Sequence, residues 1–340
     1  MQDKKVKVSI CIPTYNGQDF IEQCLRSALA QTYANLEIIV VDDCSTDSTP
    51  EIAGRYAAKD SRIKLFRNEK NLGLTGNWNR CLKLASGDWI KFLFQDDYLD
   101  PDCVEVMIDS ISPSDMMVSS ARRLVIDEAV DEATRNYSIR ETLTFERLGI
   151  AAQAPVHITP QKIASLTAGH ICMNFIGEPT VIMFKKEVVN NIGLFNTDLV
   201  QICDLEYFLR IACNYGLKYI PRQLTYFRVH KKSASSANIA NKIFFMRFAD
   251  PVIMAAELLN GTGFQRFRKS ISIPQKLKLK LFFLARMYET VRYLKTNVAD
   301  NTVKDRFERL NDTYNFTGKY MSSKIIAALL MPALKLKRLK

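Results

Sequence analysis

Strand and helix patterns alternate through the first 126 residues, and this alternation restricts the chain to a small group of folds. Apolar, β-branched-rich runs typical of buried strands stand at residues 7–12, 36–41, 63–66 and 89–94. Apolar side chains at helical spacing follow the first run, and residues 77–84 and the stretch after Pro101 are typical of further helices. Residues 116–126 are expected to form another strand. Such alternation predicts a doubly wound, mostly parallel α/β sheet flanked by helices.

Several local signals predict where these elements begin and end. Pro13 is expected to end the first strand, and Thr49 to cap a helix whose first residue is Pro50. A strand over residues 180–184 and a helix over residues 186–191 are expected next. Beyond residue 240 the chain is helical and basic.

Two aspartate pairs lie at the carboxyl ends of predicted strands. Asp42-Asp43 follow the second strand and Asp96-Asp97 follow the fourth. Ligands on doubly wound sheets bind beyond the carboxyl ends of the strands, so both pairs are expected to face one crevice. Taken alone, each pair is equally typical of a solvated turn that caps a helix.

The composition is typical of a globular protein in a reducing compartment. Hydrophobic residues make up 47% of the 340 residues, and no apolar run is long enough to span a bilayer. The amino terminus lacks the pattern of a signal peptide. The eight cysteines are scattered without metal-ligand spacing and are expected to be small core residues. We therefore expect a cytoplasmic location.

The net charge of +11 is unevenly distributed along the chain. Residues 1–220 hold 23 Lys and Arg against 29 Asp and Glu, whereas residues 221–340 hold 24 against 7. The basic part alternates Lys and Arg with Leu, Ile and Phe, notably over residues 264–295 and 324–340. This mixture favours an anionic membrane surface. A helix that only packs on the rest of the protein remains an alternative, and nucleic acid ranks last because no nucleic-acid module accompanies the charge.

Residues 6–232 carry a series of motifs that together resemble glycosyltransferase family 2, whose members have the GT-A fold. The matching segments, in the family's order and spacing, are residues 13–17, 27–33, 41–47, 71–73 and 87–90. Cys44 stands where the family usually has glycine. The resemblance implies an inverting glycosyltransferase that takes a sugar from a nucleotide diphosphate donor.

The resemblance also implies which residues bind the donor. Asp97 would bind a divalent cation, Mn²⁺ or Mg²⁺, as the last residue of the family's D-x-D motif, and Asp96 would contact the ribose or sugar. Gln95 occupies the first position of that motif. A hard cation held by carboxylate can bridge the diphosphate and neutralise it as it leaves. Asp43 would accept a hydrogen bond from the nucleobase beside Tyr15, and Pro13 and Asn71 are further donor-site residues.

Two later motifs complete the expected site. Residues 203–210 resemble the family's E-D-x-D-L-x-x-R, so Asp204 would be the base that takes the acceptor proton. Acidic residues at the start of a helix, such as Asp204 and Glu206, also interact favourably with the helix dipole, and this is the alternative explanation of their position. In residues 224–235, Arg228 would stabilise the leaving diphosphate and His230 would approach the metal from a basic loop. Residues 177–180 are assigned to the acceptor or donor sugar pocket.

The sequence thus predicts a GT-A catalytic domain over residues 1–232 and a basic helical region over residues 233–340. Within the domain, residues 1–126 would bind the nucleotide and residues 127–232 the acceptor. The resemblance implies that the acceptor is a saccharide or a lipid-linked saccharide in bacterial surface polysaccharide synthesis, at the inner face of the cell membrane. A nucleotidyltransferase is the enzymatic alternative, although residues 13–17 are not a Gly-rich phosphate loop. The non-enzymatic alternative is a membrane-bound or nucleic-acid-binding protein that has kept the fold without activity.

Overall fold

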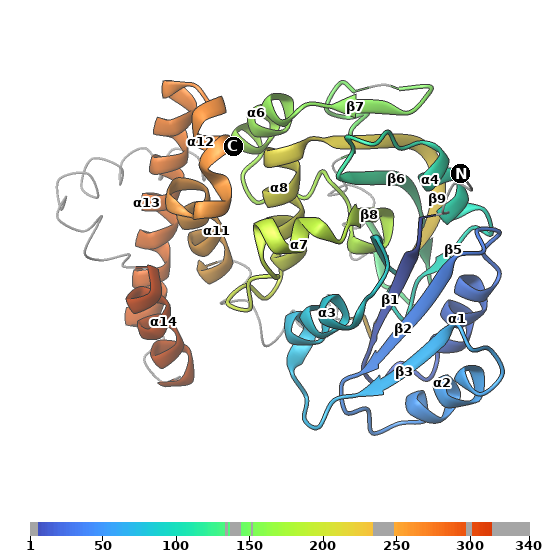
Figure 1. Ribbon diagram of the computed structural model, residues 1–340. Coiled ribbons are helices and arrows are strands. Elements are labelled where there is room, and N and C mark those ends of the chain that lie inside the picture. Colours follow the sequence, from blue (N-terminus) through green and yellow to red (C-terminus); the bar gives the residue numbers. More distant parts are fainter. Residues whose placement is uncertain are drawn as a thin grey trace. The chain divides into compact units, whose positions relative to one another are not determined.

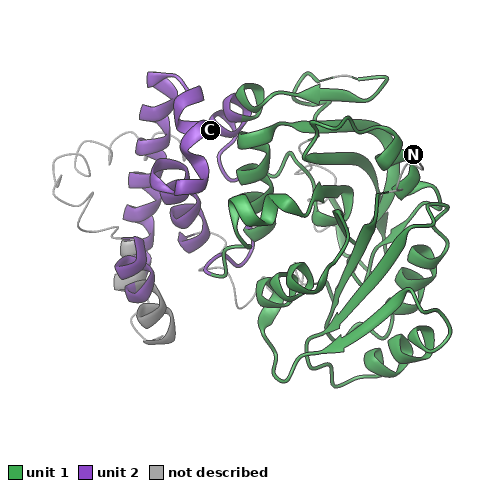
Figure 2. Ribbon diagram, viewed as in Figure 1, with its two compact units in different colours: residues 1–163, 173–197, 203–237 green, residues 164–172, 198–202, 238–340 purple. Residues whose placement is uncertain are grey.

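A computed structural model describes residues 6–132, 135–136, 144–150, 152–233, 248–296 and 301–314. The chain forms two compact units, drawn in green and purple in Figure 2. Unit 1 comprises residues 1–163, 173–197 and 203–237, and unit 2 comprises residues 164–172, 198–202 and 238–340. The predicted boundary at residue 232 takes no account of the two short internal segments that belong to unit 2.

Unit 1 is built on a nine-stranded mixed sheet. Strands β1 (Val8–Thr14), β2 (Leu36–Asp42), β3 (Ile63–Arg67) and β4 (Trp89–Phe92) are mutually parallel, in the order β3-β2-β1-β4. The sheet continues through β8 (Ile182–Lys185), β6 (Met117–Ile126), β9 (Leu217–Val229) and β5 (Tyr98–Leu99), and β7 (Val156–Ile158) pairs with β9. Strand β8 is antiparallel to β4 and to β6. The predicted doubly wound, mostly parallel sheet is confirmed.

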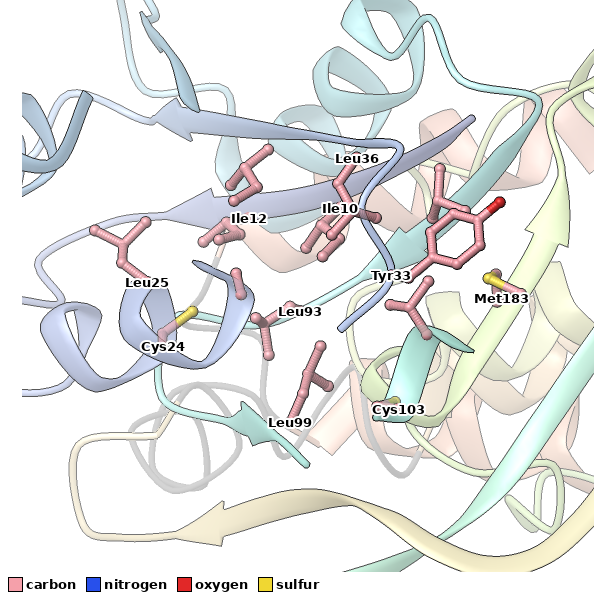
Figure 3. Packing of buried hydrophobic residues seen from close by; sticks show 14 of the residues in the cluster. Ile10, Ile12, Cys24, Leu25, Tyr33, Leu36, Leu93, Leu99, Cys103 and Met183 are labelled. Carbon is pink, nitrogen blue, oxygen red and sulfur yellow. The ribbon is translucent and has the colours of Figure 1, made fainter. Parts of the chain in front are cut away.

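Helices cover both faces of this sheet (Figure 1). They are α1 (Ile21–Leu29), α2 (Thr49–Ala57), α3 (Gly73–Leu84), α4 (Cys103–Asp109), α7 (Glu187–Ile192) and α8 (Cys203–Tyr215), with α6 (Pro160–Gly169) divided between the units. Successive β1 side chains point to opposite faces. Ile10 and Ile12 pack with Cys24 and Leu25 of α1 in the main apolar cluster (Figure 3). Cys11 points the other way, toward the Cys81 carbonyl of α3. The apolar alternation of the strands therefore fills two helix–sheet layers.

Three local predictions are wrong. Strand β1 continues through Pro13 because beyond Cys11 it pairs only with β2, which leaves one side without ladder bonds to supply. Ser48, not Thr49, occupies the N-cap position of α2. Residues 179–181 form a 3₁₀ turn before β8 rather than strand. Residues 224–229, for which no element was predicted, lie in β9, and His230 follows the end of that strand.

Unit 2 is helical in the part that the structure describes. It contains α11 (Asp250–Asn260), the turn η3 (Thr262–Phe264), α12 (Gln265–Ser270), α13 (Ile273–Thr296) and α14 (Asn301–Tyr314). Its core includes Phe264, Phe267 and Phe283, which are fully buried. None of the described helices is long and apolar enough to cross a membrane. Residues 324–340, for which membrane binding was expected, lie outside the described residues.

Candidate functional site

The carboxyl end of β4 carries the second aspartate pair. The chain leaves the strand at Phe92, and Asp97 is buried at 1% exposure while Asp96 stays half-buried. Asp97 Oδ2 accepts a 2.5 Å hydrogen bond from Thr180 Oγ1, and Asp97 Oδ1 accepts a 3.0 Å bond from the Arg228 amide. Thr180 precedes β8 and Arg228 lies in β9, so three strands converge on this carboxylate.

Negative charge is concentrated around Asp97. Burial raises the pKa of the Asp97 carboxyl well above its usual range, and the neighbouring Asp96 carboxylate raises it further. Hydrogen bonds from Thr180 and the Arg228 amide oppose this shift. A bound cation would offset the repulsion between two carboxylates that lie this close together after a buried strand.

The carboxyl end of β9 lies against this pair. His230 is 5% exposed, and its Nε2 is 3.0 Å from Asp96 Oδ2. The Arg228 guanidinium donates to the Asp96 carbonyl and to Gln23 Oε1, and lies 5.1 Å from the centre of the Phe20 ring. His230 also packs on Phe20, with ring centroids 4.2 Å apart. The structure thus brings Asp96, Asp97, Arg228 and His230 together, and it builds the guanidinium into the wall of the site.

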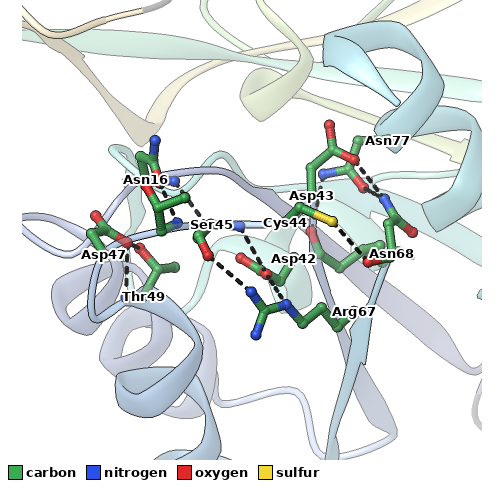
Figure 4. Close-up of polar contacts among 12 residues, drawn as sticks. Asn16, Asp42, Asp43, Cys44, Ser45, Asp47, Thr49, Arg67, Asn68 and Asn77 are labelled. Carbon is green, nitrogen blue, oxygen red and sulfur yellow. Dashed lines mark hydrogen bonds and ion pairs between the residues drawn. The ribbon is translucent and has the colours of Figure 1, made fainter. Parts of the chain in front are cut away.

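The carboxyl end of β2 carries the other aspartate pair in a polar network (Figure 4). Asp43 is buried, and its Oδ1 accepts 2.8 Å bonds from Asn68 Nδ2 and from the Leu72 amide. The preceding Asp42 forms an ion pair with Arg67 at 3.4 Å. Asp47 instead binds the first residue of α2, since it accepts bonds from the Thr49 amide and hydroxyl. Asp43 therefore belongs to this polar network and does not bind the start of α2.

The backbone after Asp43 explains the glycine that is usual at the next position. Cys44 has a φ of 63°, in the left-handed region that favours glycine. Its thiol donates to the Asn68 carbonyl at 2.9 Å. This contact ties the residue to the same asparagine that binds Asp43.

The remaining predicted donor residues lie in or next to the first loop and before α3. Pro13 is buried in β1, opposite Val41 in the strand register. The Tyr15 side chain is 47% exposed, and its backbone is bound by the Gln95 side chain. Asn71 Oδ1 accepts a 2.8 Å bond from the Gly73 amide at the start of α3. Tyr15 and Asn71 are therefore exposed, whereas Pro13 is buried.

The two acids that open α8 have different environments. Glu206 is buried at 1% exposure and forms an ion pair with Arg210 at 2.8 Å, while Arg210 also donates to the carbonyls of Ile192 and Leu194. Asp204 is half-exposed. The helix itself is held by Tyr207, which stacks on Phe195 with centroids 3.9 Å apart. Glu206 is thus held in a buried ion pair, whereas Asp204 is only partly buried.

The loop before β8 contributes residues that the motifs did not assign individually. Thr180 binds Asp97, and its carbonyl accepts a hydrogen bond from the fully buried Lys91 of β4. Burial lowers the pKa of the Lys91 ammonium. Glu178 pairs with Arg122 of β6. A lysine inside the otherwise apolar run 89–94 was the only sequence signal for this support.

The residues that follow β4 supply some of the ligands that a divalent cation needs. No group of three or more His, Cys, Asp or Glu that could hold a metal occurs among the described residues. Mg²⁺-type sites, however, use one or two carboxylates and complete their coordination with substrate phosphates and water. Asp96 and Asp97 supply two neighbouring carboxyl groups of this kind, and a bound cation would favour the ionised form of Asp97 over the protonated form that burial promotes.

Comparison with known proteins gives the class of this chain. Residues 9–173 match the family model described as Glycosyl transferase family 2. This segment of the chain therefore belongs to glycosyl transferase family 2.

Two relatives show the extent of the similarity. The chain is 33% identical over 222 residues to an uncharacterised protein of Mycobacterium tuberculosis, which is 65% of this chain and 66% of that protein. It is 48% identical over 91 residues to the Escherichia coli protein named UDP-Glc:alpha-D-GlcNAc-diphosphoundecaprenol beta-1,3-glucosyltransferase WfaP, which is 27% of this chain and 36% of that protein. The matched segments therefore span less than two thirds of the length of these relatives.

Solved structures agree on the fold. Staphylococcus aureus TarS 1–349 in complex with UDP-GlcNAc aligns with a TM-score of 0.57 at 19% identity, over 83% of this chain and 81% of that one. The mannosyltransferase PcManGT from Pyrobaculum calidifontis, in complex with GDP-Man and Mn²⁺, aligns with a TM-score of 0.55 at 19% identity, over 96% and 86%. These likenesses establish the GT-A type of fold and nothing about the ligands of this chain.

Proposed function

We propose that this protein is a metal-dependent, inverting glycosyltransferase that moves a sugar from a nucleotide diphosphate donor to an acceptor hydroxyl. The observation that carries the proposal is the cluster of Asp96, Asp97, Arg228 and His230 where β4 and β9 end. Acidic and basic groups of this kind, on one edge of a sheet, suit a metal-bound diphosphate. The solved neighbours with bound UDP-GlcNAc and GDP-Man support a donor of this class.

In the proposed site each residue has a separate task. Asp97, with Asp96 and His230 beside it, would hold a divalent cation that offsets the charge of the leaving diphosphate. Asp43 would accept a hydrogen bond from the nucleobase, and the exposed Tyr15 ring would contact its face. Arg228 would stiffen the wall, because its side chain already binds the Asp96 carbonyl and Gln23.

Asp204 would act as the base in a single displacement. The acceptor oxygen forms a bond to the anomeric carbon while the bond from that carbon to the phosphate oxygen breaks. The hydroxyl proton passes to the Asp204 carboxylate, and the nucleoside diphosphate leaves with the bonding electrons. A single displacement inverts the anomeric centre and needs no nucleophile from the protein.

Substitution of the base tests this mechanism. Asp204→Asn is expected to leave donor binding within twofold but to lower the rate of transfer by about 10²-fold or more, the usual scale for a general base. Asp102→Asn, which removes a surface carboxylate paired with Arg222, is the matched control and should change neither. NMR of the wild-type product should show an inverted anomeric centre. A retained configuration would exclude the mechanism, and nucleotide transfer in place of sugar transfer would favour the nucleotidyltransferase alternative.

The acceptor proposed is a saccharide carried on a lipid, in the synthesis of a bacterial surface polysaccharide. The support comes from the relative whose name specifies an acceptor linked to diphosphoundecaprenol. A lipid carrier resides in a membrane, so the proposal includes docking of the protein on the acidic inner face of the cell membrane.

Helix α13 supplies the best described surface for such docking. Its side chains Ile273, Leu277 and Leu281 follow a four-residue spacing and are 81%, 56% and 37% exposed. Exposed Lys276 and Lys280 flank this stripe, and residues 262–288 contain no Asp or Glu. An exposed aliphatic stripe beside lysines fits anionic lipid, which rewards both apolar burial and positive charge.

A further inference from the structure

The side-chain amide of Gln95 binds both polar groups of one peptide segment in the first loop. Gln95 Oε1 accepts a 2.9 Å hydrogen bond from the Tyr15 amide, and Gln95 Nε2 donates a 3.1 Å bond to the Tyr15 carbonyl. Gln95 Oε1 also accepts a 2.5 Å bond from Thr14 Oγ1. A carboxylate could supply only the acceptor half of this arrangement, because it has no proton to donate.

The Gln95 side chain occupies the space beside Gly17, so that residue 17 has no room for a side chain. A Cβ atom on Gly17 would lie 2.2 Å from Gln95 Oε1, which is far inside contact distance. The opposite side of the loop is held separately, since the Asn16 amide donates to Ser45 Oγ and the Gly17 amide donates to Thr49 Oγ1. Tyr15 is therefore fixed at its backbone on both sides while its side chain remains 47% exposed.

We infer that Gln95 is a positioning residue for the nucleobase end of the donor and is not a ligand of the metal. It acts by holding the backbone of Tyr15, so that the exposed ring keeps one orientation beside Asp43. The inference rests on the proposed function and adds to it a physical reason for glutamine at the first position of the motif. The adjacent Asp96 and Asp97 serve the diphosphate end, so one short segment after β4 serves both ends of the donor.

Calorimetry that compares a nucleoside diphosphate with inorganic pyrophosphate tests the inference. The affinities of UDP, GDP and inorganic pyrophosphate for the wild type are measured in Mn²⁺, and the tighter nucleotide is compared with pyrophosphate in the variants. Gln95→Met keeps the length and neutrality of the side chain but removes both polar groups. It is expected to weaken the nucleotide by about 10-fold, the scale of one or two lost hydrogen bonds, and to change pyrophosphate less than twofold. Gln223→Met, at an exposed residue of β9, is the matched control and should leave both affinities unchanged.

Two further variants separate positioning from loss of structure. Gln95→Asn keeps the amide but shortens its reach, so the same selective loss is expected while the thermal midpoint stays near that of the wild type. In a double-mutant cycle with Tyr15→Ala, Gln95→Met should cost much less than it does alone, because its effect passes through Tyr15.

The outcomes that overturn the inference differ from those that overturn the proposed function. Equal losses for nucleotide and pyrophosphate would make Gln95 part of the metal site. Unchanged nucleotide affinity in both Gln95 variants, or additive losses in the cycle, would remove its role toward Tyr15. A wild type that binds neither nucleotide would instead overturn the proposed donor class, and the inference with it.

Discussion

At the scale of single residues, environment distinguishes carboxylates that the sequence presents alike. Glu206 and Asp204 stand two positions apart in one motif, yet Glu206 is 1% exposed and paired with Arg210. Asp43 and Asp47 share one loop, yet Asp47 binds the first residue of α2 whereas Asp43 binds Asn68. Partners from other elements make each of these distinctions, so the sequence could name the candidates but not their tasks.

Asp97 is the residue for which we expect the clearest effect on donor binding. Asp97→Asn removes the charge that would hold the cation. Its amide oxygen can still accept from the Arg228 amide, and its Nδ2 can donate to Thr180 Oγ1 in place of accepting from it. We expect Mn²⁺ to improve donor affinity in the wild type by at least 10-fold and to have no effect in the variant, with the fold intact by circular dichroism. Titration calorimetry with and without Mn²⁺ measures both. A variant that retains the metal effect would show that the cation binds elsewhere.

At the scale of elements, one buried carboxylate joins the first three strands. Glu37 of β2 is 3% exposed and accepts hydrogen bonds from Lys7, Ser9, Lys64 and the Ser86 amide. Burial alone would raise the pKa of Glu37, but these donors outweigh burial and hold the pKa far below its usual range. The segment before β1, β3 and the turn before β4 are thereby tied to β2.

This network predicts how stability depends on pH. Folding lowers the pKa of Glu37, so its stabilising contribution is complete above the unfolded-state pKa of about 4.3 and is lost as the pH falls below that value. Glu37→Gln should lower the free energy of unfolding at pH 7 by about 1–3 kcal/mol, because buried donors lose a charged acceptor. Urea unfolding between pH 7 and pH 3 should show the wild type converging on the variant. Glu51→Gln, at an exposed helix position, is the control. A constant difference across this range would contradict the assignment.

At the scale of the whole molecule, charge and exposed apolar side chains coincide in unit 2. Residues 221–340, of which 238–340 belong to unit 2, hold 24 Lys and Arg against 7 Asp and Glu. Within unit 2, α13 combines exposed lysines with the Ile273, Leu277 and Leu281 stripe. A soluble donor requires only a few cations at one site. The surplus on an exposed helix therefore suits an extended anionic surface.

Charge reversal on α13 tests that idea. The pair Lys276→Glu and Lys280→Glu should weaken binding to vesicles with anionic lipid by about 30-fold or more, since each lysine near such a surface contributes roughly 1 kcal/mol. The pair Lys59→Glu and Lys70→Glu, exposed in unit 1, is the matched control. Donor hydrolysis should be unchanged in both, and added salt should weaken wild-type binding. Full-length protein that ignores anionic vesicles at low salt in co-sedimentation would dispose of the docking proposal.

The sequence by itself determined the class of fold and the candidate residues, because both depend on local patterns. Buried strands are written as apolar runs, helices as a 3.6-residue period, and the aspartate pairs stand where strands end. Tertiary structure decided which candidates meet. Gln95 binds Tyr15 across 80 positions, and the Arg228 amide binds Asp97 across 131. Local pattern carries no information about such contacts, because they depend on strand order and on burial, which only the packed sheet defines.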